Sequence, residues 1–164
     1  MATAYSSEAW NELFVASAGA SAALTGLLFV AVSVNIERIL EFPGLPERAL
    51  QTLLLLLSAV VISLIGLIPG ETASALGIEL LVASAGFAMA IGWMLTRTVP
   101  GAREHERAAL HLTYVLPGTL MPVIGGVSLI AGAGGGLYWV VAGIVGAILG
   151  SSVNAWVLMV EILR

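Results

Sequence analysis

The chain contains no cysteine, no lysine and no aspartate, and charged residues make up only 10% of its 164 residues. The absence of cysteine excludes disulfides, thiol nucleophiles and cysteine-ligated metal sites. All six cations are arginine and all ten anions are glutamate, so few pairs of nucleophile and base are available for catalysis. We therefore expect no enzymatic activity, no cofactor and no metal site.

Motifs for hydrolytic, phosphate-binding and nucleic-acid chemistry are also missing. The sequence has no HExxH, no GxSxG and no GxxxxGK pattern, the signatures of zinc proteases, serine hydrolases and phosphate-binding loops. His105 and His111 are six residues apart, so a helix would not place them on one face as a metal pair. No basic patch interleaved with aromatic residues occurs, so nucleic acid is not an expected partner.

Apolar residues dominate what is present. They make up 59% of the chain, its mean hydropathy is +1.05, and a soluble domain of this size cannot bury that much apolar surface. We expect one all-α integral membrane domain over residues 1–164, because uncharged runs of ~20 residues suffice to cross ~30 Å of hydrocarbon. The five expected spans are residues 13–36, 49–68, 74–96, 108–131 and 137–163.

The arginines alternate between the connections of these five spans. The lead, the second connection and the fourth connection have none, whereas the first, the third and the tail contain Arg38, Arg48, Arg97, Arg103, Arg107 and Arg164. Arginine accumulates on the cytoplasmic side of membrane proteins. The pattern predicts an outside N-terminus and a cytoplasmic C-terminus in the cell membrane. The composition, rich in Ala and Gly and free of Lys, is typical of a GC-rich prokaryotic genome.

The first span is expected to be the packing centre of the bundle. Small residues recur four apart along it, as in Gly19 and Ala23, which lets helix backbones approach closely in lipid. Its hydroxyl residues Ser17, Ser21 and Thr25 are candidates for the lining of a pore or ligand site. In contrast, the uniformly apolar run 53–57 of the second span is expected to face lipid.

Two polar residues inside later spans are further candidates for lining a pore or a ligand site. Glu79 lies near the predicted outer end of the third span, on the side of Glu71, and intramembrane acids are functional candidates by default. It would bind a cation or a proton, or else reach the headgroup region as an interfacial side chain. Asn154 in the fifth span would contact a solute, or else bridge two helices.

The fourth span is the irregular one. Pro117 and Pro122 each remove a backbone hydrogen bond, and Gly125 and Gly126 lower the stiffness just beyond them. Broken helices at membrane depth line binding sites in many transporters, so these four residues form a candidate hinge. Kinks that only improve helix packing are the alternative.

The segment 97–107 is the most charged part of the chain. It is either a solvated cytoplasmic turn or a docking site for a protein partner or anionic lipid, with Arg103 and Arg107 as the candidate contacts. The leading functional hypothesis is a homo-oligomeric channel or transporter for a small cation or solute. The alternatives are a non-transporting membrane adaptor or regulator that docks a partner through 97–107, and a binder of lipids or hydrophobic ligands with the proline-containing span as one wall.

Overall fold

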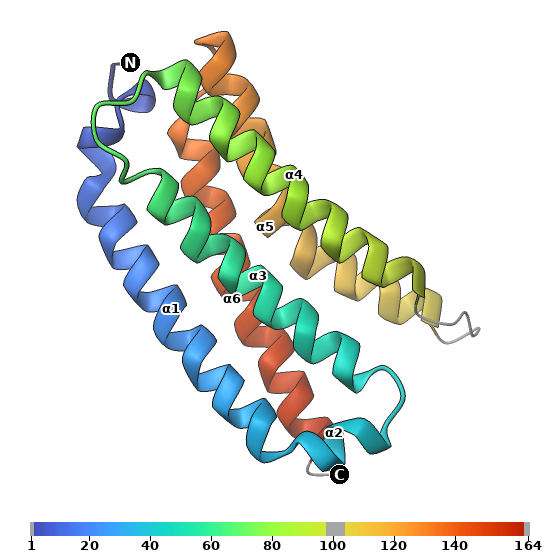
Figure 1. The fold of residues 1–164 in the computed structure, drawn as a ribbon. Helices are drawn as coiled ribbons and strands as arrows, with labels where there is room; N and C mark the ends of the chain where they lie inside the picture. Colours follow the sequence, from blue (N-terminus) through green and yellow to red (C-terminus); the bar gives the residue numbers. More distant parts are fainter. Residues whose placement is uncertain (1, 98–103, 163–164) are drawn as a thin grey trace.

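The computed structural model describes the backbone of residues 2–97 and 104–162, and the side chains of residues 3–94 and 115–160. Throughout this part of the chain all regular structure is helical, as predicted, and no strand occurs (Figure 1). Two short 3₁₀ turns come first, η1 (Ala2–Tyr5) and η2 (Ser7–Trp10). The α-helices are α1 (Asn11–Val34), α2 (Ile36–Glu41), α3 (Leu45–Ile65), α4 (Ala73–Arg97), α5 (Glu104–Ala131) and α6 (Leu137–Ile162).

Four stretches of the described chain are long and apolar enough to cross a membrane: Ser7–Val34, Leu45–Ile65, Ala73–Met94 and Leu137–Val160. The described apolar part of α5, Val115–Ala131, is a shorter apolar helix. The predicted span 108–131 therefore falls partly outside the described side chains. The length and composition of these helices are those of a membrane-embedded protein.

The first connection contains more helix than the sequence predicts. Helix α2 (residues 36–41) occupies much of the connection that we expect between the first two spans, and its Ile39 is fully buried against residues of α1 and α3. Helix α3 begins at Leu45, four residues before the predicted start. Pro46 is tolerated there, since the first turn of a helix does not use its N–H groups.

Helix α3 is the centre of the bundle, and it packs against α1, α4 and α6 (Figure 1). Half of the residues in its apolar 18-residue stretch are buried, compared with 17% in the corresponding stretch that contains α1. The prediction of α1 as the packing centre is therefore wrong. The prediction that 53–57 faces lipid is also wrong, because Leu55 and Leu56 belong to the core.

The small residues of α1 lie on its open side. A Cβ atom added to Gly19 or Gly26 would meet no other atom within 4 Å. Helix α1 instead packs through large side chains, of which Phe14 is fully buried and its ring lies against Gly66 of the α3 end. The spacing of small residues along α1 therefore does not correspond to a close helix crossing within the described part of the chain.

Close helix crossings occur instead among α4, α5 and α6. A Cβ atom added to Gly77 of α4 would lie 2.9 Å from the carbonyl oxygen of Gly126 in α5. One added to Gly146 of α6 would lie 2.8 Å from Cβ of Pro117 in α5. Glycine at these positions lets the backbones pack at short distance.

The two ends of the bundle differ in their connections. We call the end with the N-terminus, the 66–72 connection and the 132–136 loop the N-terminal end, and the opposite end, with α2 and the end of α6, the C-terminal end (Figure 1). Helices α1 and α6 both run from the N-terminal end to the C-terminal end. Residues at the ends of these two helices therefore lie at the same depth.

Candidate functional site

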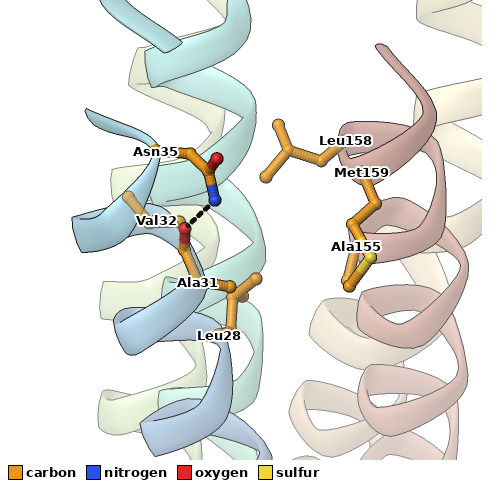
Figure 2. Close-up of a pocket in the computed structure, with 7 residues that line it drawn as sticks. All are labelled: Leu28, Ala31, Val32, Asn35, Ala155, Leu158 and Met159. Carbon is orange, nitrogen blue, oxygen red and sulfur yellow. Dashed lines mark hydrogen bonds between the residues drawn. The ribbon is translucent and has the colours of Figure 1, made fainter. Parts of the chain in front are cut away.

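A cavity of about 240 Å³ lies between α1 and α6 at the C-terminal end (Figure 2). Six of its seven lining residues are apolar and the seventh is an asparagine. Helix α1 contributes Leu28, Ala31, Val32 and Asn35, and α6 contributes Ala155, Leu158 and Met159. The sequence-based candidates did not include any of these residues, since nothing in the sequence indicates that the first and last helices face each other.

The packing around α3 explains why the cavity exists. Helices α1 and α6 each pack extensively on α3 but make few contacts with each other. Ala31 and Ala155 line the gap with side chains too small to fill it. Leu28 and Leu158 are buried in the same core cluster as Leu56 of α3, so both walls of the cavity are anchored on α3.

Asn35 is the polar group of the cavity, and it lies where α1 ends. Its backbone, with φ −107° and ψ 18°, departs from α-helical geometry and separates α1 from α2. Its Nδ2 donates a hydrogen bond to the carbonyl oxygen of Ala31 at 2.9 Å, and the amide points into the gap (Figure 2). Within the described residues, its second N–H and its Oδ1 bind no protein group.

The cavity is therefore polar at one end and apolar at the other. Leu28 lies seven residues before Asn35, about two helical turns or ~10 Å deeper in the bundle. An elongated molecule that entered beside Asn35 would place its polar group at the C-terminal end and its apolar part between the helices. That arrangement suits a lipid-like molecule better than a small ion.

The hydroxyl residues of α1 face the interior of the bundle. Ser21 is fully buried, and its Oγ has no hydrogen-bond partner among the described residues. The hydroxyl of Thr25 donates to the carbonyl oxygen of Ser21 at 2.7 Å, and Ser17 is half-buried. The role of Ser17, Ser21 and Thr25 in lining a pore stays a prediction, and Ser21 lies inside the single bundle rather than on its outer surface.

Asn154 makes a helix-bridging contact. Its Nδ2 donates a hydrogen bond to Oγ1 of Thr52 at 2.6 Å, which connects α6 to α3. The Thr52 hydroxyl in turn donates to the carbonyl oxygen of Arg48 at 2.8 Å. Asn154 is adjacent in sequence to Ala155 but does not line the cavity.

Glu79 is paired with a second carboxyl group at the N-terminal end. Its side chain is hydrogen-bonded to Glu71, and Oε2 of Glu71 is buried without a further partner among the described residues. Burial, followed by the hydrogen bond and the charge of Glu79, raises the pKa of Glu71 above its ordinary value. Glu8 and Glu12 are exposed. No group of three or more residues with metal-binding side chains occurs in the described chain.

The candidate hinge residues lie in close helix contacts. Helix α5 continues through Pro117 and Pro122. Pro122 is fully buried against Gly143 of α6, and a Cβ atom on Gly125 would lie 3.1 Å from the backbone nitrogen of Val140. Gly126 lies against Gly77 of α4. These contacts fit the alternative that the prolines and glycines improve helix packing. The role of these four residues as a hinge stays a prediction.

The N-terminal segment folds over the 132–136 loop, which the sequence did not predict. The backbone N–H of Gly135 donates to the Tyr5 hydroxyl at 3.2 Å. The rings of Trp10 and Tyr138 meet edge to face with their centres 4.8 Å apart. Aromatic residues at both segments are a signal for membrane-interface anchoring, but they also hold the ends of the chain's first and last helices together.

Two further predictions concern residues outside the described part. Arg103 and the Arg107 side chain lie there, so partner docking through them stays a prediction.

No protein-family model, no curated protein and no solved structure matches the chain.

Proposed function

We propose that the protein is a multi-pass membrane protein that binds a hydrophobic ligand in the cavity between α1 and α6. The supporting observation is the cavity itself, about 240 Å³ with six apolar lining residues and one amide. Asn35 is the single polar side chain of the lining, so most of the cavity wall offers no hydrogen bond to water or to an ion. An apolar molecule therefore suits the space between these helices better than water or an ion.

In this proposal all five long helices span a prokaryotic cell membrane, with the N-terminal end outside and the C-terminal end cytoplasmic. The arginines support that orientation, because Arg38 and Arg48 lie at the C-terminal end. The connections at the opposite end, residues 66–72 and 132–136, contain no arginine. The positive-inside rule then puts the mouth of the cavity, at Asn35, in the cytoplasmic leaflet.

The size of the cavity selects the kind of ligand. At about 240 Å³ it is smaller than the ~300–1,000 Å³ of pockets that enclose drug-sized molecules. A fused ring system such as a porphyrin or a sterol does not fit a space of that size. Part of a single hydrocarbon chain does.

The direct test is labelling with a photoactivatable palmityl probe in reconstituted membranes, followed by mapping of the labelled peptides. We expect label on α1 and α6 around Ala31 and Ala155. Ala155→Phe fills the cavity and should abolish that label. Ala142→Phe, at an exposed position of the same helix, is the matched control and should keep it. Equal labelling of the wild type and both variants would contradict the proposal.

Passage of a small cation or proton through an oligomer is the second candidate function. The Glu71–Glu79 pair supports it, because two adjacent carboxyl groups at one end of the bundle can hold a proton or attract a cation. In proteoliposomes, Glu79→Gln should then reduce cation or proton flux relative to the wild type. Absence of flux in the wild type would rule this candidate out.

A further inference from the structure

We infer that the ligand is a neutral single-chain lipid whose headgroup carries hydroxyl groups, a monoacylglycerol being the simplest case. Its chain would lie between α1 and α6, and its headgroup would meet Asn35. This inference rests on the proposed binding of a hydrophobic ligand and names its chemical class. Three properties of the cavity lead to it: its apolar lining, its amide and the charges at its mouth.

The apolar lining alone cannot select among lipids. Hydrocarbon chains in a bilayer are as apolar as leucine or valine, so a chain gains little by moving from the bilayer into the cavity. Leu28 and Val32 would accept any chain equally well. Selection must therefore come from the polar end. The volume of about 240 Å³ adds one restriction, because it has room for part of one chain but not for two.

The amide of Asn35 favours a hydroxyl group. One of its N–H groups is used by the carbonyl oxygen of Ala31. The second N–H and Oδ1 have no protein partner among the described residues. One donor and one acceptor are therefore left for a ligand. A hydroxyl both donates and accepts and satisfies the two at once. A carboxylate or a phosphodiester oxygen only accepts, which would leave Oδ1 unpaired.

The charges beside the mouth disfavour an anionic headgroup. Residues 36–48 contain three glutamates and two arginines, a formal charge of −1. Glu37 and Arg38 follow Asn35 directly, and both are exposed. Sites for anionic lipids carry clusters of about four to eight basic residues. The segment lacks such a cluster, so a neutral headgroup suits the site better than an anionic one.

The experiment compares three probes that share one chain and differ only in the headgroup. The wild type in mild detergent is offered 1-oleoylglycerol, methyl oleate, which is neutral and has no hydroxyl, and oleate at alkaline pH, and native mass spectrometry measures the retained fraction. We expect 1-oleoylglycerol to be retained about fivefold more than the other two, the factor that one hydrogen bond of about 1 kcal/mol gives.

Two variants of Asn35 test its role. Asn35→Leu and Asn35→Ala should both remove the preference, because neither side chain forms hydrogen bonds, and Ala keeps the test open if Leu perturbs the end of α1. Ser33→Ala, at an exposed position two residues earlier, is the control and should keep the preference. Circular dichroism of each variant checks that the helices are intact.

The outcomes separate the inference from the proposed function. Equal retention of the three probes, with loss of all three in Ala155→Phe, would overturn the headgroup inference and leave hydrophobic-ligand binding standing. A preference for oleate or for methyl oleate would also overturn it. Retention of no probe, or retention unchanged in Ala155→Phe, would overturn the proposed function itself.

Discussion

Asn154 on α6 and Thr52 on α3 are joined by a hydrogen bond of 2.6 Å, from Nδ2 to Oγ1. The Thr52 hydroxyl in turn donates a hydrogen bond to the carbonyl oxygen of Arg48. The two side chains together link α6 to α3. The bond lies one residue from the cavity wall at Ala155. It therefore fixes the position of α6 beside the cavity.

Replacing Asn154 by leucine should lower the free energy of unfolding by about 0.6–1 kcal/mol, the typical contribution of an interhelical hydrogen bond in a membrane. Unfolding by denaturant in bicelles measures the change. Ser152→Ala is the control, because the Ser152 hydroxyl is exposed and bonds only its own helix, at Ile148. An unchanged midpoint for Asn154→Leu would show that the bond contributes nothing to stability.

The crossing of α4 and α5 should not tolerate an added methyl group. Gly77→Ala places a Cβ atom 2.9 Å from the carbonyl oxygen of Gly126, and relief of such overpacking typically costs about 1–3 kcal/mol. Gly86→Ala on the same helix meets no atom within 4 Å and should leave stability unchanged or slightly raised. Thermal unfolding in detergent compares the two. Similar losses for both variants would argue against the close crossing.

The Glu71–Glu79 pair should make stability depend on pH. The pKa of Glu71 is raised in the folded state above the ordinary value of 4.5, so the folded protein holds a proton that the unfolded chain releases. The contribution of Glu71 is fully present below pH 4.5 and is lost as the pH rises through the folded-state pKa. The unfolding temperature should therefore fall over that window.

Glu71→Gln cannot ionise and should flatten this part of the pH profile. Glu8→Gln, at an exposed position, should leave the profile as in the wild type. The measurement is thermal unfolding in a detergent of constant charge across a pH series. A profile for Glu71→Gln that follows the wild type would remove the pair as its cause.

The open side of α1 should mediate self-association. Gly19 and Gly26 have free space around them, while glycines such as Gly77 and Gly126 lie in close crossings. We propose that a second copy packs on this side and makes the chain a homo-oligomer. Gly19→Leu with Gly26→Leu should shift the protein toward monomer in nanodiscs, read out by mass photometry. Gly92→Leu, also in open space but on α4, is the control.

The helices of this chain could be predicted from local signals, but which helices pack against one another could not. Uncharged runs and the Pro69–Gly70 pair are local features and place the helix ends within a few residues. Burial is different, because lipid and protein core are equally apolar. Leu55 is buried in α3 and Leu57 is exposed on the same helix, although the two are chemically identical. Hydropathy therefore cannot tell the central helix from a peripheral one.

The candidate site was missed for a related reason. Ala31 and Ala155 leave a cavity only because α1 and α6 lie on the same side of α3. That arrangement depends on contacts between distant parts of the chain, such as the bond between Thr52 and Asn154, which are 102 residues apart. The predicted candidates were polar residues, and most of them are used inside the protein, as with Thr25 and Asn154. The nearest sequence signal was Asn35, a polar residue at the end of the first span that our candidates did not include.

The contact of Tyr5 with Gly135 joins parts of the chain that are 130 residues apart. During synthesis the Tyr5 hydroxyl leaves the ribosome first and meets Gly135 only when the last hairpin has entered the membrane. The cavity, with its two walls on α1 and α6, cannot form before that moment either. Binding of the proposed ligand would therefore require α6 to be in place, and a protein truncated before α6 would not bind it.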